Sequence, residues 1–262
     1  MCWIFKKKYH DGAGTIKPEK GIVVFPDNEG LQRIRPELAP QWIRLAVDQG
    51  CNFSNTVNWI RHFRNVGIRV ILCLWDKGNI YNTPDLAVKY ARLFEDDVVY
   101  ELGNEPNSNI APINEPNSYV ASNIYVKLFN DFRMKIKTIN SNALVIIGGL
   151  NNQVKKRKKD QIPTWNYIEE FVRLGGKTDW WNFHQYSLDD KFYRMLEICN
   201  KLDKNKPIIL GEFPARTKDE FKFWMDKATK NSISVAVIYS WASEEQFAIY
   251  KKPDLINYIK NY

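Results

Sequence analysis

Several features that mark familiar protein classes are absent from this sequence. No apolar run approaches the roughly 18 residues that a membrane-spanning helix needs. The basic residues near the start follow the few apolar ones, which is the reverse of a secretory signal. No Pro- or Ser-rich linker divides the 262 residues. We therefore expect one domain, no membrane partner, and a cytoplasmic location or release by lysis, unless a signal was already removed.

Cysteine and histidine are also scarce. The four cysteines form no Cys-x-x-Cys pair, and the three histidines, His10, His62 and His184, are too few and too scattered for a metal site. The Gly-x-Gly-x-x-Gly, His-Glu-x-x-His and Gly-x-Ser-x-Gly motifs do not occur. We expect neither a disulfide framework nor a metal or other cofactor.

Lysine and arginine outnumber aspartate and glutamate by 38 to 30, a formal charge of +8. The strong basic runs are KKK at 6–8 and KKRKK at 155–159. We interpret them as solvated loops. An anionic polymer is the alternative partner, but no zinc-finger spacing or RNA-binding motif accompanies the runs, so we expect no nucleic-acid partner.

Short β-branched runs alternate with helical stretches along the chain, which is typical of βα units and a parallel sheet. The predicted strands are 21–25, 42–47, 70–75, 98–102, 143–149, 181–186, 207–213 and 234–241. The predicted helices are 57–63, 119–139, 165–174, 192–202, 221–228 and 255–259.

Eight such strands in a chain near 250 residues predict an α/β fold, a (β/α)8 TIM barrel, as a single compact domain. We place the barrel at 21–262 and an N-terminal extension at 1–20. An open doubly wound sheet is the alternative, but it needs a Gly-rich turn after its first strand, and this chain has none there.

Chemistry in such a barrel sits at the C-terminal ends of the strands. Polar or aromatic residues at those ends are Arg44, Trp75, Asn104, Glu105, His184, Tyr186, Glu212 and Trp241. Glu105 and Glu212 would face each other across the barrel mouth. A carboxylic acid that protonates a leaving oxygen, opposite a carboxylate that attacks an anomeric carbon, suits the cleavage of glycosidic bonds.

The runs around these two glutamates carry a family resemblance. GNEPN at 103–107 and ILGEF at 209–213 resemble the two diagnostic strands of the clan A glycoside hydrolases, a (β/α)8 superfamily that includes cellulases, mannanases, xylosidases and heparanase-like glucuronidases. The resemblance covers the chain from about residue 21 onward. ELGNEPN is most similar to the xylosidase and heparanase branches, whereas the compact length and His-x-Tyr at 184–186 are similar to family 5. Both branches stay open.

The resemblance implies a retaining hydrolase that cleaves O-glycosidic bonds of an oligo- or polysaccharide by double displacement. In that scheme Glu105 is the general acid/base and Glu212 the nucleophile. Tyr186 bonds Glu212, and Arg44 keeps its carboxylate ionised. We expect the enzyme to be a monomer that acts in polysaccharide degradation.

The resemblance also implies residues that bind the sugar. Asn104 would bond the 2-hydroxyl, and Trp241 would form a stacking floor under the reacting sugar. His184 would line the site. Trp75, Tyr81 and Trp165 are candidates for outer sugar subsites, with ordinary packing expected for at least one of them. Arg216 would suit an acidic glycan, but we expect it to be a plain surface residue.

A repeated motif offers a rival acid. NEPNS occurs at 104–108 and again at 114–118, so Glu115 competes with Glu105. The run before Asn104 has strand character, whereas the run before Asn114 contains Pro112 and predicts a loop. We therefore assign the acid to Glu105.

Two other functions remain open. The chain could be a carbohydrate-binding barrel without activity, or a binder of acidic polymers that acts through its basic runs. Transglycosylation is a variant of the enzymatic hypothesis, because sugar can replace water as the acceptor.

Overall fold

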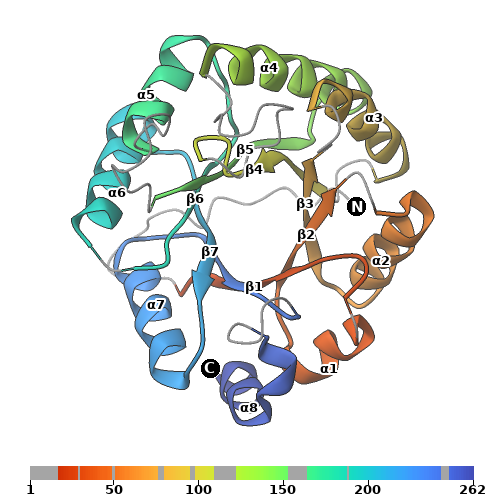
Figure 1. The fold of residues 1–262 in the computed structure, drawn as a ribbon, viewed down its shortest axis with the longest axis vertical. Helices are drawn as coiled ribbons and strands as arrows, with labels where there is room; N and C mark the ends of the chain where they lie inside the picture. The colour runs from red at the N-terminus through yellow and green to blue at the C-terminus, as the bar shows by residue number, and fades with distance from the viewer. Residues whose placement is uncertain are drawn as a thin grey trace.

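The computed structural model describes residues 17–28, 30–48, 51–75, 80–94, 98–108, 122–152, 164–187, 189–242 and 248–262. Its strands are β1 (Glu19–Val24), β2 (Trp42–Asp48), β3 (Arg69–Trp75), β4 (Val98–Asn104), β5 (Leu144–Asn151), β6 (Trp181–His184), β7 (Ile208–Pro214) and β8 (Val235–Tyr239). Each strand pairs in parallel with the next in sequence, and β8 pairs with β1, so the sheet closes into a barrel (Figure 1).

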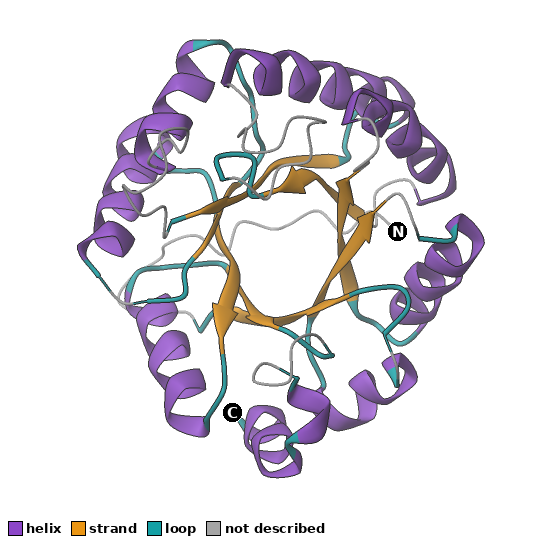
Figure 2. Ribbon diagram, viewed as in Figure 1, coloured by secondary structure: helices purple, strands orange, loops and turns teal. Residues whose placement is uncertain are grey.

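Helices form a ring outside the barrel (Figure 2). They are α1 (Ile34–Leu38), α2 (Phe53–Asn65), α3 (Thr83–Phe94), α4 (Ser122–Ile139), α5 (Thr164–Arg173), α6 (Asp190–Asp203), α7 (Lys218–Lys230) and α8 (Pro253–Asn261). The predicted single-domain (β/α)8 barrel is confirmed. The short helix α1 and the longer α3 were not predicted, although the buried residues of α3 recur at helical spacing, at Ala87, Tyr90, Ala91 and Phe94.

Some predictions fall at the edge of the described residues or beyond it. Strand β1 begins at Glu19, two residues before the predicted start of the barrel. Residues 1–16, which make up most of the predicted N-terminal extension, lie outside the described residues, as do both basic runs. Among the helices that are described, none is both long and apolar enough to cross a membrane.

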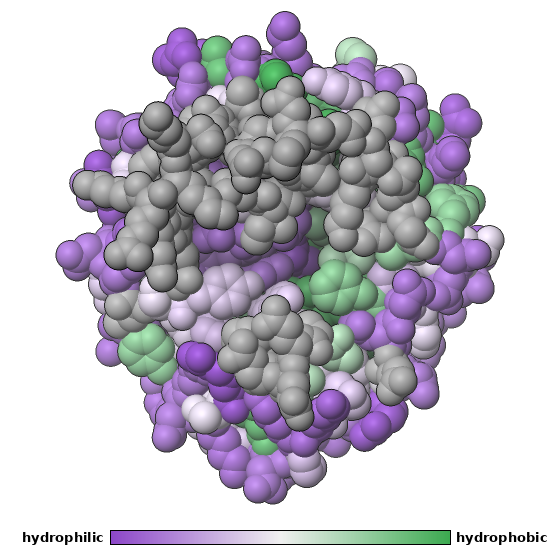
Figure 3. Space-filling view, viewed as in Figure 1, coloured by the Kyte–Doolittle hydropathy of each residue, from purple (hydrophilic) through white to green (hydrophobic). Residues whose placement is uncertain are grey.

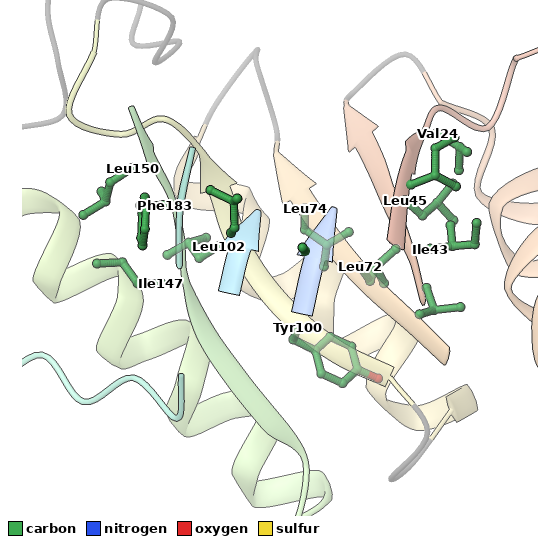
Figure 4. Close-up of a cluster of buried hydrophobic side chains, with 14 of the residues drawn as sticks. Val24, Ile43, Leu45, Leu72, Leu74, Tyr100, Leu102, Ile147, Leu150 and Phe183 are labelled. Carbon is green, nitrogen blue, oxygen red and sulfur yellow. The ribbon is translucent and has the colours of Figure 1, made fainter. Parts of the chain in front are cut away.

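Two separate apolar clusters sit on the two sides of the sheet. Because side chains alternate along a strand, Leu72 and Leu74 of β3 join the larger cluster between barrel and helices, while Ile71 joins the smaller one inside the barrel. Figure 4 shows side chains of the larger cluster, which come from neighbouring strands.

The inner cluster fills only part of the barrel. It includes Ile71, Val99, Ile146, Ile209 and Val235, one residue from each of five strands. Toward the C-terminal ends of the strands the interior carries buried charged side chains, among them Arg44 of β2, Glu101 of β4 and Glu212 of β7. Viewed down the barrel, hydrophilic residues lie in the recessed middle of the molecule, beside a hydrophobic patch (Figure 3).

The helix that follows β7 starts from a well-bonded turn. The Thr217 side chain caps α7 by accepting from Glu220 N at 3.1 Å. The Glu220 carboxylate in turn accepts from Arg216 N at 2.6 Å and Arg216 Nη2 at 2.5 Å. Burial acts to raise the pKa of Glu220, but the bonds and charge of Arg216 lower it below its ordinary value. Arg216 is thus a surface residue paired within its own turn.

We expect Glu220→Gln to lower the free energy of unfolding by about 1 kcal/mol at pH 7, because it removes a negative charge that pairs with Arg216 and lies in the first turn of α7. Because the folded pKa of Glu220 lies below its unfolded value of about 4.3, its contribution is present above that pH and is lost as pH falls through the folded pKa. Urea unfolding at neutral and acid pH measures this. A wild-type-to-variant difference that stays constant with pH would contradict the prediction.

Candidate active site

A bulge in β7 directs Glu212 into the barrel mouth. From Leu210 to Phe213 the chain of β7 advances by three residues, while its paired strand β8 advances by only two. The pairing of β7 with β6 shifts at the same point. An extra residue in one strand re-aims the side chain beside it. The extra residue falls at Gly211, where a Cβ would lie 2.1 Å from Asn182 Oδ1, so glycine alone fits there. Glu212 is 5% exposed.

A left-handed turn places Glu105 close to Glu212. Glu105 directly follows β4 and has φ +50°, a conformation uncommon for any residue except glycine. Its backbone N donates to Gly149 O at 2.9 Å, which holds the turn against β5. Its carboxylate Oε2 accepts from Asn151 Nδ2 at 2.9 Å and from Ser108 Oγ at 3.2 Å. Glu105 is thereby fixed at the C-terminal end of the barrel, 4% exposed.

Beneath the two carboxylates lies a buried ion pair. Arg44 of β2 is 1% exposed and Glu101 of β4 is fully buried. The guanidinium binds both oxygens of Glu101, with Nε–Oε2 at 2.8 Å and Nη2–Oε1 at 2.7 Å. It also donates from Nη1 to Glu212 Oε1 at 2.7 Å and from Nη2 to Asn104 Oδ1 at 2.9 Å. One planar fork therefore orients three site residues.

The charges of this layer favour the ionised guanidinium. Burial acts to lower the pKa of Arg44, but the charges of Glu101 and Glu212 raise it well above its ordinary value. Burial raises the pKa of the Cys73 thiol, whose Sγ lies 3.3 Å from Arg44 Nη2. Arg44 therefore presents a permanent positive charge to Glu212.

Two residues at or just after the end of β6 contact the carboxylates, and His184 contacts both of them. His184 Nδ1 lies 3.0 Å from Glu105 Oε1 and 3.5 Å from Glu212 Oε2. The Tyr186 hydroxyl donates to Glu212 Oε2. Burial, followed by the charges of Glu212 and Glu105, holds the pKa of Tyr186 well above its ordinary value, so its hydroxyl keeps the proton that it donates. The contact predicted between Tyr186 and Glu212 is present.

Glu105, His184 and Glu212 form a compact triad. One ligand-type atom from each lies within 4.8 Å of the other two, and all three side chains are buried. By distance alone the triad could hold a metal ion. The hydrogen bonds to Arg44, Tyr186 and Asn151 already account for the approach of the carboxylates, so the geometry needs no metal to explain it.

The aromatic side chain predicted for a stacking floor lies on the wrong side of the sheet. Trp241 is fully buried, belongs to the outer cluster, and packs against Tyr250 with ring centroids 6.2 Å apart. Tyr239, the last residue of β8, is half-buried and packs on the inner cluster. Its ring centroid lies 6.0 Å from that of Tyr186. In this structure Tyr239, rather than Trp241, is the aromatic residue that adjoins Tyr186, which bonds Glu212.

The remaining aromatic candidates differ in their surroundings. Trp75 ends β3, is 5% exposed, and covers Gly103, where a Cβ would lie 2.2 Å from its ring. Tyr81 is 60% exposed. Trp165 is half-buried, with the Arg194 guanidinium 4.4 Å from its ring centroid. Glu115 lies outside the described residues. The roles of Trp75, Tyr81 and Trp165 in sugar binding stay predictions.

Several residues of the site were not predicted from the sequence. Glu101 was a detectable signal, because a charged residue inside the buried run VVYELG needs a charged partner. Tyr239 was detectable from alternation, since it shares a face with Val235 and Val237. Asn151 and Ser108 carried no such signal, because only the fold brings them to Glu105.

Removing the buried negative charge of Glu101 should destabilise the fold. We expect Glu101→Gln to lower the free energy of unfolding by about 3 kcal/mol, because it removes the carboxylate that binds the buried Arg44 guanidinium through both oxygens. A matched exposed pair, Lys201 with Glu169, provides the control: Glu169→Gln should cost less than about 1 kcal/mol. Urea unfolding of both variants tests this, and equal effects would contradict it.

Known proteins resemble this chain in their structures. No protein-family model matches the sequence, and no curated protein matches it. A family 39 β-xylosidase from Caulobacter crescentus superposes with a TM-score of 0.69 at 12% identity, over 96% of this chain and 72% of that chain. An endo-1,4-β-mannanase from Rhizomucor miehei gives 0.62 at 12% identity, over 97% and 95%.

A glucosidase from Croceicoccus marinus gives a TM-score of 0.67 at 10% identity, over 92% of this chain and 63% of that one. The chain thus spans less than two thirds of that glucosidase. Identities this low show the fold alone, and by its fold the chain is similar to the (β/α)8 glycoside hydrolases of clan A.

Proposed function

We propose that this chain is a retaining glycoside hydrolase that cleaves O-glycosidic bonds in an oligo- or polysaccharide. The observation that carries the proposal is the closeness of two buried carboxylates, Glu105 and Glu212, at the C-terminal mouth of the barrel. Their nearest ligand-type oxygens lie within 4.8 Å. Retaining pairs sit about 5–5.5 Å apart, whereas inverting pairs need about 6.5–9.5 Å to admit a water.

The surroundings of the two carboxylates support different roles. Glu212 accepts from the Arg44 guanidinium and from the Tyr186 hydroxyl, so a positive charge stabilises the anion that a nucleophile must be. Glu105 is bonded by His184, Asn151 and Ser108. These contacts hold the carboxyl group in place and suit a group that gains and loses a proton in each turnover.

The proposed reaction has two balanced steps. Glu212 attacks the anomeric carbon while the glycosidic carbon–oxygen bond breaks, and the proton of Glu105 passes to the leaving oxygen. In the second step Glu105 takes a proton from water, whose oxygen attacks the anomeric carbon and releases Glu212. Two inversions at one carbon retain its configuration. Asn104 offers its amide N–H to a sugar hydroxyl, since its Oδ1 is occupied by Arg44.

Tyr239 is our proposed sugar platform on β8, in place of Trp241. The Tyr239 ring is partly open and adjoins Tyr186, which itself bonds Glu212. A ring placed there could contact the apolar face of a sugar that is bound over the nucleophile.

A panel of polysaccharides and aryl glycosides, read by released reducing sugar, tests the function. The matched blank is Glu212→Gln, and proton NMR of the first product reports the anomeric configuration. We expect turnover with retention. Binding without turnover would favour the inactive carbohydrate-binding barrel, and an inverted first product would overturn the double displacement. Adding a sugar acceptor separates transglycosylation from hydrolysis.

A further inference from the structure

Gly149, near the end of β5, contacts three parts of the candidate site. Its N–H donates to Glu101 Oε1 at 2.8 Å, and its carbonyl accepts from Glu105 N at 2.9 Å. A Cβ at this position would lie 1.9 Å from His184 Nε2, with Cδ2 and Cε1 of the same ring its next nearest atoms. Any residue could make the two backbone bonds, but only glycine leaves room for the ring.

The His184 ring is held between this backbone and the two carboxylates. Nε2 faces Gly149, while Nδ1 faces Glu105 Oε1 at 3.0 Å and Glu212 Oε2 at 3.5 Å. Nε2 is buried and has no hydrogen-bond partner among the described residues. A histidine is usually oriented by a bond to its second nitrogen. Here the packing of the ring against Gly149 orients His184 instead.

A side chain at residue 149 would therefore push the ring toward the carboxylates. A normal carbon–nitrogen contact is near 3.4 Å, so the ring would have to move by more than about 1 Å. Glu105 is the nearer carboxylate and is otherwise held by the neutral groups of Asn151 and Ser108. Glu212 is anchored by the charge of Arg44. The displacement should fall mainly on Glu105.

We propose that Gly149 is a positioning residue for the acid/base carboxylate, acting through the His184 ring. This inference rests on the proposed glycosidase function. It predicts a defect in proton donation rather than in formation of the glycosyl–enzyme bond. Substrates with a good leaving group need little proton donation, so they should be spared.

The test compares two glycosides of one sugar, one with a dinitrophenyl leaving group and one with an alkyl or sugar leaving group. Gly149→Ala should lose about 100-fold in kcat/KM on the poor leaving group, because a shift of about 1 Å can remove that much. It should lose less than about tenfold on the dinitrophenyl glycoside. Equal losses on both substrates in a folded variant would mean a merely structural role and would overturn the proposal.

Gly176 supplies the matched control. A Cβ there would lie 2.5 Å from atoms of the Phe171 ring, so Gly176→Ala also crowds a buried aromatic ring, but beyond the C-terminus of α5 rather than at the site. It should lower the melting temperature and leave the ratio of the two activities unchanged. A ratio that moves as much as in Gly149→Ala would show that crowding alone causes the effect, which would overturn the inference.

A double variant tests the route through His184 and still works if Gly149→Ala fails to fold. Removing the ring removes the clash, so Gly149→Ala/His184→Ala should match His184→Ala within about twofold on both substrates. A further large loss in the double variant would overturn the proposed route. Failure of the parent function is distinguishable, because the wild-type chain would then turn over neither glycoside.

Discussion

Glu212→Ala is expected to reduce hydrolysis of every substrate by about four orders of magnitude, because it removes the group that forms the covalent bond to the sugar. The fold should survive, since Arg44 keeps its bidentate pair with the buried Glu101. The measurement is kcat/KM on natural and dinitrophenyl glycosides, alongside a melting curve. A variant that keeps a tenth of the activity would remove Glu212 from the nucleophile role.

A small anion sharpens this test. Azide can occupy the space that the Glu212 carboxylate leaves and attack an activated glycoside from the same face. Only one inversion then occurs, so the glycosyl azide should have the inverted configuration. A retained glycosyl azide from Glu212→Ala would assign the nucleophile to another residue.

The second large effect concerns the acid. Glu105→Gln should lose about 10²–10⁴-fold on a natural glycan, the usual contribution of general acid catalysis. It should form its covalent intermediate almost normally from a dinitrophenyl glycoside, whose leaving group needs no proton. Rapid-mixing kinetics should therefore show a burst of released phenol followed by slow turnover. Equal loss on both substrates would contradict the acid role.

Glu115 provides the matched comparison, because it lies in a second copy of the same five-residue motif, NEPNS, at 114–118. We expect Glu115→Gln to keep most of the activity on a natural glycan. Glu105 sits where β4 ends, bonded to β5 and β6, which gives the rigid placement that a proton donor needs. Loss of activity in Glu115→Gln with survival of Glu105→Gln would reverse the assignment.

The two glutamates could be predicted because each follows a run of buried-strand residues. Local patterns carry such information: eight apolar runs with helical stretches between them indicate a closed parallel barrel, and the ends of parallel strands meet at one edge. The charge of Glu101 inside one of these runs carried the same kind of information, but its partner Arg44 is 57 residues away.

What the sequence determined by itself was the barrel and the strand ends that bring Glu105, Glu212, His184 and Tyr186 together, because alternation and strand order are local properties of the chain. The tertiary structure decided which side of the wall each residue faces and how closely the groups approach. Tyr239 faces inward because the inward side chains of β8 follow every second residue from Val235. The strand ends at Tyr239, so its alternation does not extend to Trp241, which packs in the outer cluster. The bulge at Gly211 and the bare backbone of Gly149 depend on neighbouring strands, since only their contacts show that a side chain would not fit.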